Sequence, residues 1–322
     1  MRRAALLGLR RYEEAKRRPA ATHGTTRARC GAATLLHLGH GEDTAKAPVV
    51  LIPSLVNSHH ILDLAERTSL ARYLASRGHD PWLVDWGQPQ AGDHMLDLGG
   101  HIEHRLLPML RSIERPCILA GYCLGGTIAI AAAQLLPALA VATIAAPWQF
   151  DNYPEQDLAL ILRLWQEAKP LCERLGYVPM EVLQTGFWAL DPQRTIRKYA
   201  AFAQMGEDSE ESHAFMAVED WANEGAPLTF GAASELFERL YGGNVTGKGE
   251  WRVGGQTITP ERFAGPSFSI QSSGDRIVPA AAAPRLRQCH ESALGHVGMI
   301  VSRKAPEQIW SLVSEWLSNN GG

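Results

Sequence analysis

The chain has 322 residues, a net charge of -3 and 45% hydrophobic residues. This composition is typical of a globular protein with a large core, and it excludes disordered and fibrous classes. With 31 basic and 34 acidic side chains, no overall field attracts nucleic acid, and we expect no nucleic-acid partner. The length exceeds the usual ~100 to 200 residues of one domain, so we expect one large core with an inserted subdomain.

The cysteines indicate a reducing compartment, and we predict a cytoplasmic protein. Residues 1–11 begin like a signal peptide, but Arg10 and Arg11 interrupt the apolar stretch. A short amphipathic helix or a basic tail fits this segment better. Without CxxC spacing, the five cysteines indicate neither a disulfide framework nor a zinc site: they are Cys30, Cys117, Cys123, Cys172 and Cys289.

A long stretch between Arg115 and Asp151 contains no charged residue, and its length would suit a membrane span. Gly125, Gly126 and Pro137 interrupt it, however, and its two halves have different periods. A buried strand, a turn, a helix and a second strand explain it better, because parallel strands covered on both faces lose their polar alternation. We therefore predict no transmembrane span.

Short apolar runs rich in β-branched residues, each followed by a turn and a helical segment, predict a mostly parallel sheet built from βαβ units. Longer helical stretches then indicate an inserted, mainly helical cap, with tryptophans at Trp165, Trp188, Trp221 and Trp251. The expected strands are residues 48–53, 81–85, 117–120, 140–144 and, after the cap, 266–271. The expected helices are residues 62–77, 127–136 and 306–317.

These patterns divide the chain into four parts. We predict an N-terminal extension with the first edge strands (1–46), the first part of the core (47–150), the inserted cap (151–263), and the last core strands with a C-terminal helix (264–322). The tryptophans of the cap could line a dry channel or form simple core, and the second reading is the more common one for such a pattern.

The turn from Gly121 to Gly126 contains the candidate nucleophile, Cys123. It follows a predicted strand and precedes a predicted helix, as in the nucleophile elbow of an α/β-hydrolase fold with Cys in place of Ser. Glycines on both sides allow the close backbone approach that such a sharp turn needs. The helix N-terminus favours a thiolate and an oxyanion. The alternative is a glycine-rich turn with an incidental core cysteine.

A nucleophile at an elbow needs a base and an orienting acid, in the chain order nucleophile, acid, histidine. Asp275 follows the last predicted strand, and His296 comes 21 residues later between glycines. His290 is the rival base, but its neighbours indicate a surface or strand-edge position. Asp275 is convincing only through its order and spacing with the other two, since a lone Asp after a strand is usually a turn former.

The same chemistry needs two backbone amides as an oxyanion hole. Leu124 supplies one, and Val56, in the loop after an early strand, is the expected second. Asn57 and Tyr122 are their neighbours, and we expect both to bind substrate. Two histidine pairs, His59 with His60 and His101 with His104, suggest a metal enzyme. No nearby residues complete a metal site, so we expect no metal.

Several segments from about residue 48 to the C-terminus resemble the polyhydroxyalkanoate synthases. They are residues 56–70 with Val56-Asn57 and Ile61-Leu62-Asp63-Leu64, then Val84-Asp85-Trp86-Gly87, the Gly121 to Gly126 turn, Asp275 with Ile277-Val278-Pro279, and Gly295-His296-Val297-Gly298. In that family the Cys holds the acyl or growing polyester chain, His is the base, and Asp supports deprotonation of the incoming hydroxyl. The resemblance implies these roles for Cys123, His296 and Asp275.

The resemblance also implies a reaction and partners. The substrate would be a 3-hydroxyacyl-coenzyme A, with no cofactor beyond this thioester, and the product a polyester at whose granule surface the protein would act. About 47 residues precede the first core strand, as in the short synthases that work with a partner subunit. A homodimer is a further expectation. Arg276 departs from the family, because many members have His directly after the Asp.

Other functions remain open at this point. A Cys-dependent esterase, a thioesterase or an intracellular polyester depolymerase could use the same three residues, because the fold and the triad do not fix the acceptor. A non-catalytic scaffold with the same fold is a second class of alternative.

Overall fold

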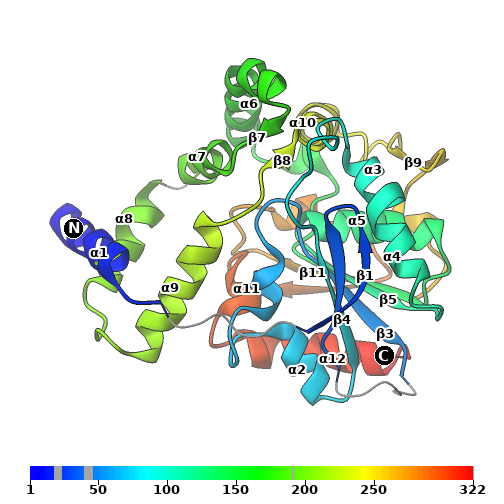
Figure 1. Cartoon of the computed structure of the whole chain (residues 1–322), viewed down its shortest axis with the longest axis horizontal. Helices are drawn as coiled ribbons and strands as arrows, with labels where there is room; N and C mark the ends of the chain where they lie inside the picture. Colours follow the sequence, from blue (N-terminus) through cyan, green and yellow to red (C-terminus); the bar gives the residue numbers. More distant parts are fainter. Residues whose placement is uncertain (18–23, 40–45, 191, 322) are drawn as a thin grey trace.

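The computed structural model of the chain describes residues 1–17, 24–39, 46–190 and 192–321. Within these residues an eight-stranded sheet forms the centre of the molecule (Figure 1). Its strand order is β1-β2-β4-β3-β5-β6-β11-β12. The strands from β4 to β12 are parallel, whereas β2 is antiparallel to both of its neighbours. Their bounds are Thr25–Cys30 (β1), Ala33–His37 (β2), Pro48–Ile52 (β3), Asp80–Asp85 (β4), Ile118–Tyr122 (β5), Ala140–Ile144 (β6), Ser267–Ser272 (β11) and Gln288–Ser292 (β12).

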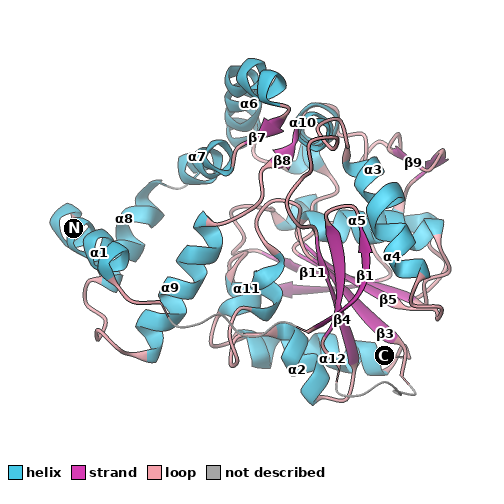
Figure 2. Cartoon of the chain, in the orientation of Figure 1, coloured by secondary structure: helices cyan, strands magenta, loops and turns pink. Residues whose placement is uncertain are grey.

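Helices cover both faces of this sheet, which is why the central strands β3, β5 and β6 are buried along their whole length (Figure 2). One face packs against α3 (Leu98–His101), the π-helix η2 (Ile102–Leu106), α4 (Leu107–Arg111) and α5 (Leu124–Leu135). The other packs against α2 (Leu70–Ser76), α11 (Gly298–Val301), the π-helix η7 (Pro306–Trp310) and α12 (Ser311–Ser318). The predicted parallel sheet is therefore confirmed.

The expected helix at residues 62–77 is wrong over its first part. A 3₁₀ helix, η1 (His59–Asp63), is followed by a turn closed by a bridge between Ala65 and Thr68. The helix α2 starts only at Leu70, because the Ser69 side chain accepts a hydrogen bond from the Arg72 amide at 2.9 Å. The apolar residues before Ser69 gave a helical period without forming a helix.

The charge-free stretch forms β5, α5 and β6, as predicted. The helix begins at Leu124 and not at residue 127, because Cys123 ends the turn and α5 follows it directly. In the part of the chain that the structure describes, no helix combines the length and the apolar character that crossing a membrane would require.

The segment between β6 and β11 is mainly helical. Its longer helices are α6 (Glu155–Leu175), α7 (Met180–Leu190), α8 (Pro192–Phe202) and α9 (Glu210–Asn223), followed by α10 (Phe230–Ser234) and the π-helix η4 (Glu235–Tyr241). Short 3₁₀ helices occur at η3 (Phe150–Asn152), η5 (Pro260–Arg262) and, after β11, η6 (Ala280–Ala282). Two small ribbons pair β7 (Tyr177–Val178) with β8 (Leu228–Thr229), and β9 (Arg252–Val253) with β10 (Gln256–Thr257).

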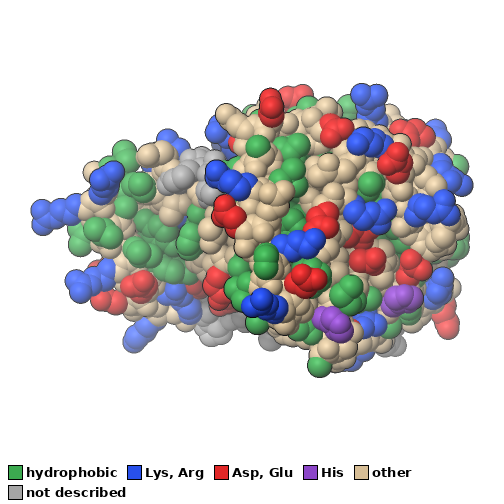
Figure 3. Space-filling view, turned by 90° about the horizontal axis from the view of Figure 1, so that it is seen from above, with side chains coloured by type: hydrophobic (Ala, Val, Ile, Leu, Met, Phe, Trp, Pro, Cys, Tyr) green, Lys and Arg blue, Asp and Glu red, His purple; other side chains and the backbone are tan. Residues whose placement is uncertain are grey.

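The N-terminal segment is a helix, α1 (Arg2–Glu14), which lies against α8 far from the first strand (Figure 1). Tyr12 of α1, Phe202 of α8 and Met216 of α9 form a small core of their own. In the space-filling view this lobe extends from one end of the molecule, and apolar side chains lie on it between Lys and Arg side chains (Figure 3). Of the two interpretations of residues 1–11, a short amphipathic helix and a basic tail, the structure shows the helix, and contacts with α8 fix its place.

Candidate active site

Cys123 lies in a tight turn between β5 and α5. Its backbone has φ 56° and ψ -132°, a conformation that is strained for any residue other than Gly. The turn is held by a hydrogen bond from the Cys123 amide to the Ile144 carbonyl at 2.9 Å. A Cβ atom at Gly125 would come within 2.5 Å of the Pro53 carbonyl oxygen, and one at Gly126 within 2.5 Å of the Ala146 methyl. The glycines therefore allow close packing around Cys123, the candidate nucleophile.

Asp275 and His296 reach each other from neighbouring loops of the sheet edge. Asp275 follows β11, His296 follows β12, and the His296 Nδ1 to Asp275 Oδ2 distance is 2.6 Å. The other oxygen of Asp275 accepts hydrogen bonds from the amides of Ile277 at 2.8 Å and Val278 at 2.9 Å. Both carboxylate oxygens are thus occupied, so the carboxylate holds the ring with its second nitrogen free for Cys123.

The electrostatics link His296 to Cys123 as well. Burial alone would lower the pKa of His296, but the Cys123 sulfur, a hydrogen bond to it and the Asp275 carboxylate outweigh burial and raise this pKa to about 10. The structure therefore brings Cys123, His296 and Asp275, which are far apart in the sequence, into one cluster. With its pKa raised in this way, the imidazole of His296 is protonated at neutral pH.

Tyr122 and Asn57 were expected to bind substrate, and both line the cavity at Cys123. Tyr122 is buried, and its hydroxyl donates to the His296 carbonyl oxygen at 3.3 Å while its ring lies 5.2 Å from the imidazole. These two contacts with Tyr122 help to fix the position of His296. Asn57 has a positive φ of 76°, and its side-chain amide donates to the Ala222 carbonyl at 3.4 Å.

The two expected oxyanion amides differ in their surroundings. Leu124 is the first residue of α5, where amides have no acceptor within the helix. The Val56 amide already donates to the Ser54 hydroxyl at 3.0 Å. Val56 can therefore serve an oxyanion only by sharing or exchanging this bond. Ser54 is a residue that the sequence analysis missed, since a Ser in a loop gives no signal of this kind.

Cys123 lies where two cavities meet, and Ser54, Val56 and Ile277 also line both. The first cavity, of about 190 Å³, has a polar wall that includes Lys198, Glu219 and Arg276. The second, of about 120 Å³, is lined by apolar side chains: among them are Ile161, Leu164, Trp165, Leu183, Leu236 and Phe237. The site thus offers a polar and an apolar chamber on the two sides of the thiol.

Three of the four predicted cap tryptophans reach these chambers. Trp165 lines the apolar one, and Trp188 and Trp221 line the polar one. Trp251 is fully buried elsewhere, with its indole nitrogen donating to Glu235 at 2.8 Å.

The wall of the polar chamber also includes an ion pair, Lys198 to Glu219 at 2.6 Å, that the sequence analysis did not identify. Its two residues belong to different helices, and neither has a distinctive sequence context.

Arg276 is exposed and lines the polar chamber next to Asp275. The Asp275 to His296 hydrogen bond is present beside Arg276.

The rival base, His290, lies exposed on β12. Its position at the sheet edge agrees with the expectation for it.

The histidines that suggested a metal have other contacts. His59 lies 3.0 Å from an Asp85 carboxylate oxygen. His101 is buried, with Nδ1 2.7 Å from the Asp97 carbonyl oxygen, whereas His104 is exposed. Among the described residues, no group of three or more His, Cys, Asp or Glu side chains could hold a metal ion.

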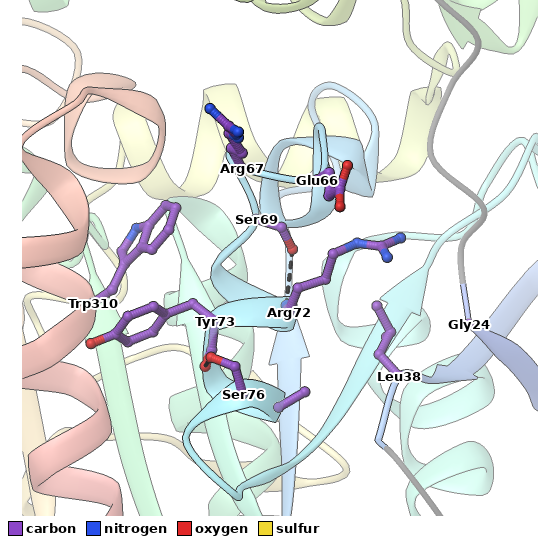
Figure 4. Close-up of a pocket in the computed structure, with 10 residues that line it drawn as sticks. Gly24, Leu38, Glu66, Arg67, Ser69, Arg72, Tyr73, Ser76 and Trp310 are labelled. Atoms are coloured by element: carbon purple, nitrogen blue, oxygen red, sulfur yellow. Dashed lines mark hydrogen bonds between the residues drawn. The ribbon is translucent and has the colours of Figure 1, made fainter.

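A third cavity, of about 420 Å³, lies at α2 and is lined by none of the predicted site residues (Figure 4). Tyr73 and Trp310 form one side of it, and Arg72 lies on the other. The Arg72 guanidinium pairs with Asp63 at 2.7 Å. Cys123 and His296 line the polar chamber and not this third cavity.

Comparison with known proteins gives relatives at moderate identity. No protein-family model matches the chain. The poly(3-hydroxyalkanoate) polymerase subunit PhaC of Haloferax mediterranei is 27% identical over 88% of this chain and 61% of its own length. PhaC subunits of Haloarcula marismortui and Synechocystis sp. are each 26% identical, over 86% of this chain and over 62% and 79% of their own lengths. The chain thus spans less than two thirds of the first two relatives, and the resemblance seen in its motifs is confirmed.

Solved structures with the same fold are more distant in sequence. A thermophilic esterase from Thermogutta terrifontis has a TM-score of 0.54 at 14% identity and covers 92% of this chain and 100% of its own. A monoacylglycerol lipase from Paleococcus ferrophilus has a TM-score of 0.54 at 15% identity, over 89% and 99% of the two chains. At such identities these neighbours show the fold alone. Together with the strand order, they confirm an α/β-hydrolase fold.

Proposed function

We propose that this chain, which resembles the polyhydroxyalkanoate polymerase subunits, is an acyltransferase that polymerises 3-hydroxyacyl-coenzyme A into a polyester. The observation that supports this most is the Cys123, His296 and Asp275 cluster, in which Cys123 lies on a turn that resembles the cysteine-containing turn of that family. The proposed chemistry needs no cofactor beyond the thioester substrate.

The first half-reaction loads the enzyme. The Cys123 thiolate attacks the thioester carbonyl carbon, a bond forms between Sγ and that carbon, and the carbonyl oxygen becomes an oxyanion next to the Leu124 amide. When the oxyanion collapses, the bond from carbon to the coenzyme A sulfur breaks. The imidazolium of His296 gives its proton to the leaving thiolate, which departs as free coenzyme A. The acyl group remains on Cys123.

The second half-reaction forms the ester. His296, now neutral, accepts the proton of the 3-hydroxyl group of another hydroxyacyl unit, and the hydroxyl oxygen attacks the acyl carbon on Cys123. A carbon–oxygen bond forms, the carbon–Sγ bond breaks, and Cys123 is restored as a thiolate beside an imidazolium. Water in the same position would give hydrolysis, so the apolar chamber at Cys123 supports transfer over hydrolysis.

The experiment supplies purified protein with 3-hydroxybutyryl-coenzyme A and follows free thiol and polymer together. We expect both to appear. Release of free hydroxyacid without polymer would contradict the proposal and favour a thioesterase or a depolymerase of the same fold. Cys123→Ala removes the nucleophile, so thiol release should fall by at least ~1,000-fold. Cys289→Ala, which changes an exposed thiol on β12, is the matched control and should act like the wild type.

The surroundings of the reaction follow from the same proposal. The protein would work in the cytoplasm at the surface of the polyester granule, with a partner synthase subunit or as a homodimer. If a partner is needed, the assay above will give polymer only after a partner subunit of the short synthases is added. A loaded acyl group on Cys123, detected by mass spectrometry, would then still appear without the partner.

A further inference from the structure

The loop after β3, residues 53–58, is held from outside the core by the helix α9. The indole nitrogen of Trp221 donates to the Ser58 carbonyl oxygen at 2.9 Å. The next residue of α9, Ala222, accepts the side-chain amide of Asn57 at 3.4 Å through its carbonyl oxygen. Two consecutive residues of the loop are thus bonded to two consecutive residues of α9, which are more than 160 positions away in the sequence.

This loop matters because it contains Val56, the expected second amide of the oxyanion hole. Its shape is uncommon, since Asn57 has a φ of 76°, a region that few non-glycine residues adopt although Asn tolerates it better than most. Oxyanion donors act only if they are preorganised, and a displacement of about 1 Å can cost about 100-fold in rate. A group that fixes Ser58 and Asn57 therefore bears on how well Val56 is placed.

The position of α9 is in turn fixed by the N-terminal segment, through Tyr12 of α1 and Arg17 just after it. Asp220, directly before Trp221, accepts the Tyr12 hydroxyl at 2.5 Å and the Arg17 guanidinium at 2.8 and 2.9 Å. The carboxylate is partly shielded, with its side chain 24% exposed. The indole of Trp221 thus extends from a helix that is anchored at the residue next to it.

We propose that Trp221 is a positioning residue whose indole N–H holds the loop 53–58 in the conformation that stabilises the oxyanion during acyl transfer to Cys123. The inference rests on the proposed function only in that the site transfers acyl groups through an oxyanion. Trp221 also lines the polar chamber, so its effect on the loop must be separated from contact with the substrate.

Trp221→Phe removes the donor and keeps an aromatic ring. Two reactions of the same thiol then separate the roles. Acylation by p-nitrophenyl butyrate passes through an oxyanion, whereas alkylation by iodoacetamide does not, although both need the thiolate. We expect the saturating rate of Cys123 acylation to fall by about 10-fold or more and alkylation to stay within about twofold. Hydrogen exchange should rise for the amides of residues 54–58.

Trp316→Phe is the matched control, because it removes an indole hydrogen bond to Gln288 at 2.7 Å on the C-terminal helix, away from Cys123. It should leave acylation, alkylation and exchange in the loop unchanged. Exchange in residues 54–58 that equals the wild type would overturn the proposal. So would acylation and alkylation that fall together, or a loss expressed in KM with the saturating rate intact.

The two proposals fail in different ways. A wild-type protein that accepts the butyryl ester and makes no polymer contradicts the polymerase function, while the ratio of acylation to alkylation in Trp221→Phe still reports on the loop. If the wild type accepts no ester, the exchange of residues 54–58 decides alone. An unaltered exchange then refutes the role of Trp221.

Discussion

At the scale of single residues, His296 determines the charge state of the site. Its ring is buried and bonded to Asp275 on one side, and Cys123 interacts with the other. The partners raise its pKa to about 10, against an ordinary value of 6.5. The interaction with Cys123 is the largest of the influences that raise this pKa, ahead of the hydrogen bond to Asp275.

The first prediction is therefore a titration. In wild-type protein, the imidazole of His296 should remain protonated through pH 8, and in Cys123→Ala it should titrate at a clearly lower pH, because the largest influence that raises its pKa is gone. NMR of ¹³C-labelled histidine measures both, with His296→Gln to assign the signal. Equal titration curves in the two proteins would show that Cys123 does not act on His296.

The raised pKa of His296 also makes the free energy of unfolding depend on pH. Because the folded pKa lies above the unfolded one, the protonated imidazole stabilises the fold fully below pH 6.5, and this contribution is lost as the pH rises toward about 10. The difference in free energy of unfolding between wild type and His296→Gln should thus narrow from pH 6 to pH 10. Urea unfolding at several pH values measures it, and a difference that widens with pH would contradict the assignment.

At the scale of elements, α1 depends on a single small residue. A Cβ atom at Gly8 would collide with the Tyr199 carbonyl group of α8, so only Gly permits this approach. The contact brings Tyr12 onto Phe202 and Arg11 onto carbonyl oxygens at the end of α8, at 3.0 Å from Phe202 and 2.5 Å from Met205. A helix of 13 residues is marginal by itself in water, so α1 needs this surface.

We predict that Gly8→Val releases α1. The added side chain cannot fit against α8, and the small core around Tyr12 should lose about 1 to 3 kcal/mol. Limited trypsin digestion should then cut at Arg10, Arg11 or Arg17 several times faster than in the wild type. Leu7→Val places the same side chain on the exposed side of α1 and is the control. If both variants are cut at the wild-type rate, the contact with α8 does not hold the helix.

At the scale of the whole molecule, a buried carboxylate joins the helical segment to the core. Glu235, at the start of η4, accepts the amides of Leu98 at 2.8 Å and Gly99 at 3.2 Å, which begin α3. Trp251 donates to its other oxygen at 2.8 Å. Burial raises the pKa of Glu235. Its ionisation above pH 4.5 therefore opposes folding, and the hydrogen bonds offset this cost.

Removing the Glu235 carboxylate should lower the free energy of unfolding more than removing a surface ion pair does. Glu235→Ala leaves three buried donors unpaired, so we expect a loss of about 2 to 4 kcal/mol in the free energy of unfolding. Glu235→Gln should lose less, because it keeps one acceptor oxygen and buries no charge. Glu14→Ala breaks an exposed ion pair with Arg10 on α1 and should lose much less. Urea unfolding at pH 7 compares the three variants, and equal losses for Glu235→Ala and Glu14→Ala would contradict the role of Glu235 in joining the helical segment to the core.

The sequence by itself determined the five parallel strands β3, β4, β5, β6 and β11, and it singled out the three candidate site residues at their edge. Buried strands such as β3 and β5 are continuous apolar runs, and the turn at Cys123 needs glycines at fixed offsets, so both leave a local pattern. A local pattern also gave a wrong prediction: the residues before Ser69 have a helical period, although the helix begins only at Leu70. The order of Cys123, Asp275 and His296 was enough to group them.

Only the tertiary structure decided what surrounds that group. The chambers at Cys123, the bond from Trp221 to the loop after β3, and the docking of α1 on α8 join residues that are more than 100 positions apart. Such contacts depend on which faces of the helices pack against each other. Side chains such as Lys198 and Ser54 have no distinctive sequence spacing from which their place at the site could be predicted. The turn at Cys123 could be predicted because its geometry is local, whereas its environment results from packing between distant parts of the chain.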